Sequence, residues 1–235
     1  IHAAEKSLEY IKHYLISHPQ FLISSPELTL AYFGELSLAL GRREEAIAIS
    51  SRILERLGIL TFEPIAFAQI ASFFQAVSGV STRCKAHFKT ISETLKENFE
   101  NKQKGGGPMN LAAWAELVNV FRDVDQEFSR KVSEWLTQQQ LPDGAFPESD
   151  RSDFVYTRGT GKIFEVLALN PEKNKEVIER VLPWLFSMQY DEENTFFVPE
   201  EIRPKLIGGF RHDYFNSEAW IDAAGHLLLG GARLR

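Results

Sequence analysis

Cysteine is almost absent from this sequence, and so are the features that would place the protein in a membrane. Cys84 is the one cysteine in 235 residues, so no internal disulfide can form. We therefore expect a reducing compartment, the cytoplasm. No apolar run reaches the roughly 18 residues of a membrane-spanning helix, and nothing near Ile1 resembles a signal sequence. Because residue 1 is Ile rather than Met, we expect further residues upstream of it.

A basic stripe is also missing. The formal net charge is −6, and the 26 Lys and Arg residues are scattered among 32 Asp and Glu residues. Proteins that bind nucleic acid or anionic membranes usually concentrate basic side chains on one face. We therefore expect no nucleic acid, no membrane surface and no transmembrane segment among the partners of this protein.

Apolar residues, in contrast, are plentiful enough for a sizeable core: 44 % of the chain is hydrophobic, with 18 Phe and 4 Trp. Strand-type alternation is almost absent, and the 3.6-residue period of helices recurs throughout. Two kinds of helix alternate along the chain. The predicted buried helices, apolar on nearly every side, span 28–40, 64–78, 111–121, 161–169 and 217–229. The predicted exposed helices, charged on one side, span 2–16, 43–57, 82–99, 126–140 and 171–189, the last starting with Asn170 as cap and Pro171 at the first helical position.

One phrase occurs twice. Trp135-Leu136 is followed by Gln140, and Trp184-Leu185 by Gln189, so both pairs recur at an offset of 49 residues, 184 − 135 and 189 − 140. This offset is the size of one helical hairpin with its connections. The sequence therefore predicts an all-α fold, an α/α toroid of about five helical hairpins in a single domain, 1–235. Because closed toroids with six hairpins exist, we expect an open ring here, or one completed by a partner chain or a missing segment.

The first copy of the phrase continues through Asp143-Gly144-Ala145-Phe146, and in this form it resembles the QW-type repeat of the squalene and terpenoid cyclases and the related protein prenyltransferase β subunits. The second copy has Asn194 where Gly is usual, and Asn also tolerates positive φ. The resemblance implies a central cavity lined by aromatic rings and a hydrophobic, isoprenoid-type small molecule as ligand. The phrase itself predicts a structural turn, in which the Gln satisfies backbone groups and the Phe folds back on the core.

The acid motifs of the terpenoid cyclases are not intact. The nearest match to Asp-x-Asp-Asp is Asp123-Val124-Asp125-Gln126, which falls in a short turn between helices, where Asp123 and Gln126 form a capping box. No Asp-Asp pair exists for an aspartate-rich metal motif, and Cys84 lacks the Asp-x-Cys pattern of a zinc site. We therefore expect no metal and no cofactor.

Two long loops, each leading from an exposed helix to the next buried one, carry the candidate functional residues. Such loops lie on the same rim of a toroid, where binding chemistry usually collects. A His beside a carboxylate is suited to acid–base catalysis near neutral pH. The candidate catalytic residues are His212, Asp213, Asp150 and Asp153. The candidate substrate-binding residues are Tyr156, Arg158, Arg211 and Tyr214, with Phe164 and Trp220 lining the cavity below.

Three functions fit these observations, and the sequence leaves open whether the protein is an enzyme. The first is a terpenoid-cyclase-like enzyme or isoprenoid binder. The second is a six-hairpin carbohydrate-active enzyme, a glycosidase, lyase or epimerase, which would use two carboxylates or a His and a carboxylate at the polar mouth. The third is a non-catalytic interaction module. His226, next to Gly225, is interpreted as a satisfied core histidine.

Overall fold

The computed structural model describes residues 6, 26–57 and 64–234. Contacts divide the chain into two compact units, 1–106 and 107–235, and each is described here by itself. The predicted all-α class is confirmed, because the described residues form helices joined by loops, and pairing between extended segments is limited to isolated bridges in those loops. The single domain remains a prediction, and the predicted helix 2–16 lies outside the described residues.

The described residues of unit 1 form two helical hairpins. They are formed by α3 (Pro26–Ala39) with α4 (Arg43–Leu57) and by α5 (Pro64–Ser78) with α6 (Thr82–Gln103). The buried helices α3 and α5 pack against each other. Gly34 makes this close approach possible, since a Cβ there would lie 2.3 Å from the ring of Phe73. Ser81 begins α6 by accepting a hydrogen bond from the backbone N–H of Cys84 at 3.4 Å.

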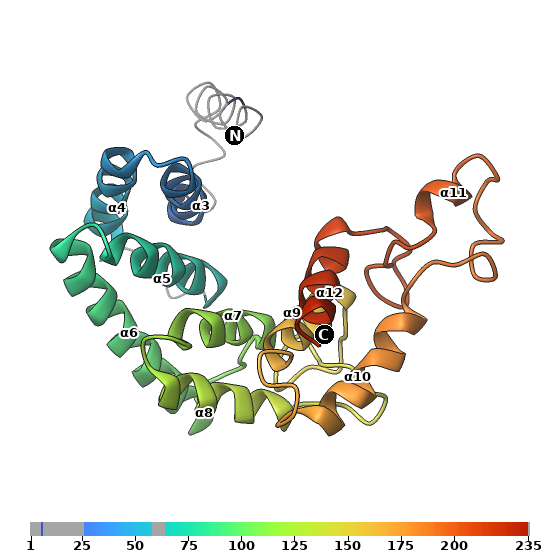
Figure 1. Ribbon diagram of the computed structural model, residues 1–235. Helices are drawn as coiled ribbons and strands as arrows, with labels where there is room; N and C mark the ends of the chain where they lie inside the picture. The colour runs from blue at the N-terminus through green and yellow to red at the C-terminus, as the bar shows by residue number, and fades with distance from the viewer. Residues whose placement is uncertain (1–5, 7–25, 58–63, 235) are drawn as a thin grey trace. The chain divides into compact units, whose positions relative to one another are not determined.

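Unit 2 continues the same alternation (Figure 1). Its inner helices are α7 (Leu111–Phe121), α9 (Thr157–Leu167) and α12 (Ile221–Arg233), and α9 packs between the other two. The outer helices α8 (Gln126–Thr137) and α10 (Lys175–Ser187) cover α7 and α9. A short helix, α11 (Arg203–Leu206), belongs to the loop between α10 and α12. The prediction that buried and exposed helices alternate is confirmed for the described helices up to α10. It is wrong for α12, predicted to be buried, where only Ala223 and Gly230 are buried and Leu228 is 75 % exposed.

Several helix starts differ from the prediction, among them α12, which begins at Ile221, four residues after the predicted 217. The outer helix begins at Lys175, because residues 170–174 form turns and Asn174, not Asn170, occupies the N-cap. The Asn174 side chain donates to the carbonyl of Leu167 at 2.8 Å, so it joins the two helices instead of capping α10. The inner helix α9 begins at Thr157, four residues before the predicted 161.

The turn predicted from the repeated phrase is confirmed for the first copy. Gln140 donates to the carbonyls of Gly144 at 3.0 Å and Val177 at 2.9 Å, which joins the turn to α10. Gly144 has φ +95° and Phe146 is fully buried. The second copy differs, because Asn194, which stands at the position of Gly144, does not have a positive φ. Its aromatic Phe196 is 76 % exposed.

The start of α8 separates the two candidate aspartates. Asp125 is the N-cap and accepts from the backbone N–H of Phe128 at 3.0 Å. Asp123 pairs instead with the neighbouring Arg122. The predicted capping box of Asp123 and Gln126 is therefore wrong, because the N-cap lies two residues later, at Asp125. Both carboxylates serve the turn between α7 and α8.

Candidate functional site

The loop before α9 and the loop before α12 lie side by side within unit 2. Thr157 joins them, because its backbone N–H donates to the carbonyl of His212 at 2.8 Å and its hydroxyl donates to the carbonyl of Arg211 at 2.6 Å. Isolated bridges fold each loop back on itself, one between Pro147 and Val155 and one between Arg211 and Ala219. The first helical residue of α9 therefore fixes the position of His212.

His212 and Asp213 form a hydrogen-bonded pair. The Nδ1 atom of His212 lies 2.6 Å from the Asp213 carboxylate. The other carboxylate oxygen accepts from the backbone N–H groups of Phe215 at 2.7 Å and Asn216 at 2.8 Å. Since a carboxylate only accepts, Nδ1 carries the proton and Nε2 is left as the reactive nitrogen.

The same contacts set the charge of Asp213, which is buried. Burial works to raise its pKa, but the hydrogen bonds from His212 and the two backbone amides outweigh burial and lower the pKa of Asp213 below its usual value. The carboxylate thus stays ionised at neutral pH. An ionised partner fixes the tautomer and the orientation of the His212 ring.

Aromatic rings form a row through His212. The rings of Phe154 and Tyr156 stack with centroids 5.9 Å apart, and Tyr156 stacks on His212 at 5.8 Å. Trp220 covers the other side of His212, at 4.5 Å and a tilt of 51°. Tyr156 and Trp220 are the N-cap residues of α9 and α12, so the row follows the starts of two neighbouring inner helices.

Tyr156 lies closely over the first turn of α9. Gly159 gives it room, because a Cβ at that position would be 2.6 Å from the ring. Burial raises the pKa of the Tyr156 hydroxyl above its ordinary value, although the charge of Arg158 works in the opposite direction. The hydroxyl therefore stays protonated at neutral pH and is a potential proton donor.

Arg158 lies beside the row but is already paired. Its Nε atom is 2.8 Å from the carboxylate of Asp222, and both side chains remain partly exposed. Trp220 donates from its indole N–H to Glu218 at 3.4 Å. Arg158 and Asp222 thus place a polar pair next to the aromatic rings, at the first turns of α9 and α12.

The structure does not bring the other candidates into this group. Asp150 accepts from the backbone N–H of Met109 at 2.7 Å and so ties two loops together, while Asp153 is exposed. Tyr214 accepts from the indole N–H of Trp184 on α10 at 2.5 Å. Arg211 lies over the ring of Tyr190, at 5.6 Å from its centroid. Phe164 is part of the core, where Gly230 of α12 packs against its ring.

Sequence reasoning missed a second His–carboxylate pair. His226 of α12 places Nδ1 2.8 Å from the carboxylate of Glu165, a buried residue of α9. Lys162 and Arg233 also contact this carboxylate, each at 3.4 Å. The predicted core histidine is thus satisfied by Glu165, yet its side chain is 23 % exposed. One signal was available, since Glu165 is the only charged residue in the apolar stretch 163–169.

A cavity of unit 2 lies at the opposite end of α9, between the short turns that lead into α8 and α10. It measures about 430 Å³ and is lined mainly by polar side chains, including Arg130 and Lys173. Both of these cations already pair with Glu134, at 2.9 Å and 2.8 Å. The cavity contains neither a histidine nor an aromatic ring among its lining residues, so it offers less chemistry than the aromatic row.

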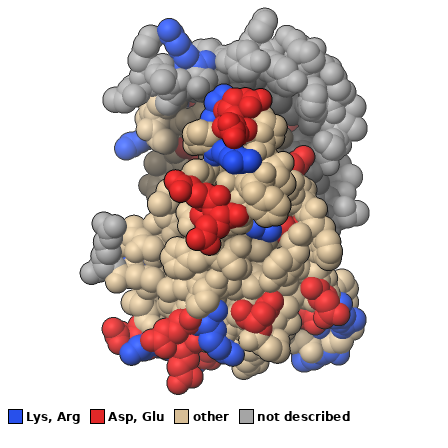
Figure 2. All heavy atoms as spheres, turned by 90° about the vertical axis from the view of Figure 1, so that its right-hand side faces the viewer, with Lys and Arg blue, Asp and Glu red and all other residues tan. Residues whose placement is uncertain are grey.

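Charge and metal-binding groups give no further site. On the described part of the face in Figure 2, basic side chains stand apart among acidic and uncharged ones. Within the described residues, no group of three or more His, Cys, Asp or Glu side chains is arranged to hold a metal ion. The described helices include none that is long and apolar enough to cross a membrane.

Comparisons with known proteins identify a fold and no family. No family model matches the chain, and no curated protein matches it either. Among solved structures, a polysaccharide lyase has a similar fold, with a TM-score of 0.53 and 14 % sequence identity. The alignment covers 89 % of this chain and 72 % of the lyase. At this identity the likeness shows the fold alone.

This comparison corrects the resemblance to terpenoid cyclases and prenyltransferases, which is wrong, because the solved structure with a similar fold is a polysaccharide lyase. The physical reason lies in the repeated phrase. Its Gln140 and Gly144 join a turn to the next outer helix, a task that any array of helical hairpins requires. Phe164, which was expected to line an apolar cavity, is buried in the core instead.

Proposed function

We propose that this protein is a carbohydrate-active enzyme that cleaves an acidic polysaccharide by β-elimination at the aromatic row. The observation that carries the proposal is the position of His212, which is held by Asp213 and flanked by the rings of Tyr156 and Trp220. Partly accessible aromatic rings such as Tyr156 and Trp220 bind the apolar faces of sugars, and an oriented imidazole transfers protons. The fold shared with a polysaccharide lyase supports the same reaction class.

The proposed reaction uses His212 as base and Tyr156 as acid. His212 Nε2 takes the proton from the sugar carbon next to the carboxylate. The electron pair of that C–H bond forms a carbon–carbon double bond as the bond to the glycosidic oxygen breaks. The leaving oxygen takes the proton of the Tyr156 hydroxyl, whose raised pKa keeps it protonated beforehand.

Hydrolysis by two carboxylates has less support in the same place. A glycosidase needs one carboxylic acid and one carboxylate on either side of the scissile bond. The Asp213 carboxylate already accepts hydrogen bonds from His212 and two backbone amides, and the Asp150 carboxylate accepts one from the backbone amide of Met109. The histidine and the tyrosine are therefore better placed for proton transfer than the carboxylates.

The test is a spectroscopic assay with polygalacturonate, alginate and hyaluronan as probes. Elimination creates a double bond conjugated with the carboxylate, which absorbs in the ultraviolet, whereas hydrolysis does not. We expect absorbance to rise with at least one polymer, and to fall about a hundredfold or more in His212→Asn and Tyr156→Phe. His212→Asn keeps an N–H near the position of Nδ1 and removes Nε2. New reducing ends without ultraviolet absorbance would refute elimination and favour hydrolysis.

A further inference from the structure

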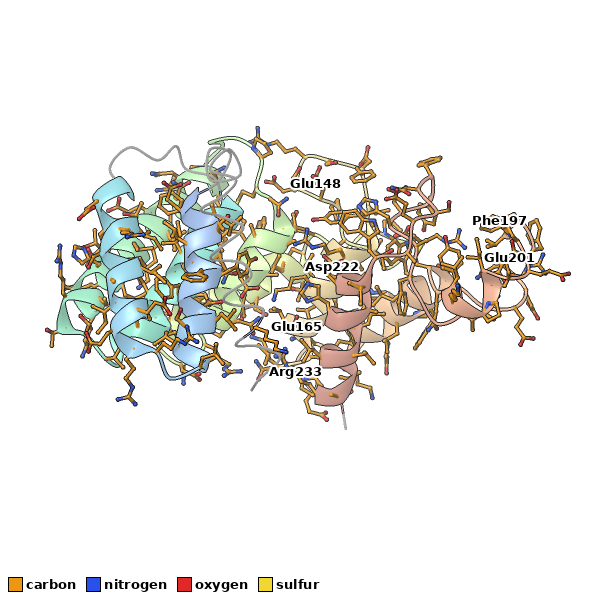
Figure 3. The ribbon with its side chains drawn as sticks, turned by 90° about the horizontal axis from the view of Figure 1, so that it is seen from above. Glu148, Glu165, Phe197, Glu201, Asp222 and Arg233 are labelled. Atoms are coloured by element: carbon orange, nitrogen blue, oxygen red, sulfur yellow. The ribbon has the colours of Figure 1, made fainter. Side chains whose placement is uncertain are left out.

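A polar stripe runs from the aromatic row along the contact between α9 and α12. Asp222, His226 and Arg233 are spaced by four and seven residues and so share one side of α12. Arg158, Lys162 and Glu165 follow the facing side of α9. Figure 3 shows Asp222 and Arg233 toward opposite ends of α12, with Glu165 between them and Glu148 beyond the Asp222 end.

The centre of the stripe is built around one buried carboxylate. Glu165 is only 4 % exposed, and it contacts His226 at 2.8 Å and Lys162 and Arg233 at 3.4 Å. Arg233 also donates to the backbone carbonyl of Glu165 at 2.6 Å. Close helix packing supports this arrangement, because Gly161 of α9 lies against Leu227 and His226 of α12.

The three basic side chains remain accessible. The exposed fraction of the side chain is 13 % for Lys162, 23 % for His226 and 29 % for Arg233. The side chain of Glu165, at 5 %, is more deeply buried than all three. The remaining charged neighbour is Glu116 of α7, which pairs with Lys162. His226 uses Nδ1 for Glu165, and no described residue bonds to Nε2.

We propose that Lys162, His226 and Arg233 form a binding subsite for the anionic group of an acidic sugar unit, with Glu165 as the residue that holds them together. The inference rests on the proposed function, because it extends the same substrate along α9 and α12. From Trp220 to His226 the helix rises roughly 9 Å. The subsite therefore contacts a different sugar unit from the one that lies against the aromatic row.

Charge makes the subsite sensitive to pH. With His226 neutral, Lys162 and Arg233 balance Glu165 and Glu116. With His226 protonated, the five side chains carry three positive charges and two negative ones. Binding of an anion and protonation of His226 therefore favour each other. Affinity for an acidic sugar chain should therefore increase as the pH is lowered and His226 becomes protonated.

The experiment measures binding of the whole 235-residue chain to polygalacturonate and to its fully methyl-esterified form by calorimetry, at several pH values. A carrageenan, which carries sulfate without carboxylate, shows which anionic group is bound. His226→Asn keeps an N–H near Nδ1 for Glu165 and removes Nε2. His87→Asn on α6 is the matched control, since it makes the same change outside the stripe.

We expect the wild-type chain to bind polygalacturonate more tightly than the ester, and increasingly so at lower pH. His226→Asn should weaken this binding about tenfold and remove the pH dependence, because a charge-assisted hydrogen bond is lost. The ester should bind both proteins equally, and His87→Asn should behave as wild type. Equal affinity for polymer and ester, no binding of either polymer, or unchanged affinity in His226→Asn would overturn the subsite. The subsite stands without the proposed function if His226→Asn weakens binding while no polymer is cleaved.

Discussion

Gly144 lies against the backbone carbonyl of Arg180 on α10, so closely that a Cβ at position 144 would come within 2.1 Å of that oxygen. The glycine also has φ +95°, a conformation that L side chains rarely adopt. Both the positive φ and the close contact with Arg180 therefore require glycine at position 144. The contact joins the turn after α8 to α10, the outer helix of the following hairpin.

Gly144→Ala should lower the free energy of unfolding by about 3 kcal/mol, since backbone strain and overlap with α10 add together. Urea unfolding followed by tryptophan fluorescence measures this loss. Gly208→Ala is the control, because Gly208 has φ +87° but no neighbouring atom within 4 Å of the added Cβ. It should lose only the strain part, about 1 kcal/mol. Equal losses in the two variants would show that the contact with Arg180 is unimportant.

Asp125→Ala should lower the free energy of unfolding by about 1 kcal/mol, because the N-cap bond to Phe128 is lost. Asp125→Asn should cost less, since Asn also caps helices. Asp123→Ala should change stability less than Asp125→Ala, because Asp123 is exposed and only pairs with Arg122. We expect all three variants to retain polysaccharide cleavage, measured by ultraviolet absorbance. Loss of cleavage with an unchanged Tm would assign these aspartates a catalytic role.

Stability should depend on pH through Glu165. Burial works to raise its pKa, but the hydrogen bond from His226 and the charges of Lys162, His226 and Arg233 lower it below the ordinary value of 4.5. A carboxylate whose pKa is lowered in the folded state stabilises the protein at any pH above the carboxylate's pKa in the unfolded state. This contribution is lost as the pH falls through its pKa in the folded state. Glu165→Gln should therefore be less stable than wild type at pH 7, by about 3 kcal/mol. The difference should shrink below pH 4.5. A difference independent of pH would show that the carboxylate's charge does not matter.

Tyr214→Phe should leave sugar binding unchanged, because the Tyr214 hydroxyl faces Trp184 and Asp143, at 2.5 Å and 3.5 Å, and not His212. It should lower the free energy of unfolding by about 1 kcal/mol, since the buried indole N–H of Trp184 loses its acceptor. Calorimetry with polygalacturonate measures the first effect and urea unfolding the second. Weaker binding with unchanged stability would show that Tyr214 contacts the sugar and belongs to the site.

The helical architecture could be predicted because it depends on local patterns. The apolar residues of 64–78 and the charged ones of 43–57 each repeat with the helical period, and the structure places helices at both. The turn at Gln140 and Gly144 could be predicted because glycine and a turn residue stand together in the sequence. The start of α9 could not, since Gly159 and Gly161 serve contacts with Tyr156 and α12 that no local pattern reveals.

The proposed site shows the same division. His212 was a candidate because Asp213 is its neighbour in sequence, and the structure pairs the two. The contact between His226 and Glu165 could not be predicted, because 61 residues separate the partners and only the packing of α12 on α9 joins them. Tyr214 shows the opposite case. It is adjacent to Asp213 in sequence, but its side chain turns toward α10.

The packing of α12 on α9 also determines how far the chain can be shortened for expression. Gly230 fits over the Phe164 ring, and Arg233 binds both the carboxylate and the carbonyl of Glu165. A protein ending at residue 220 would uncover that ring and leave Glu165 with Lys162 alone. A buried carboxylate that has lost most of its partners, beside exposed aromatic surface, favours aggregation over a soluble fragment. Truncations and C-terminal fusions therefore need to retain the whole of α12 through Arg233.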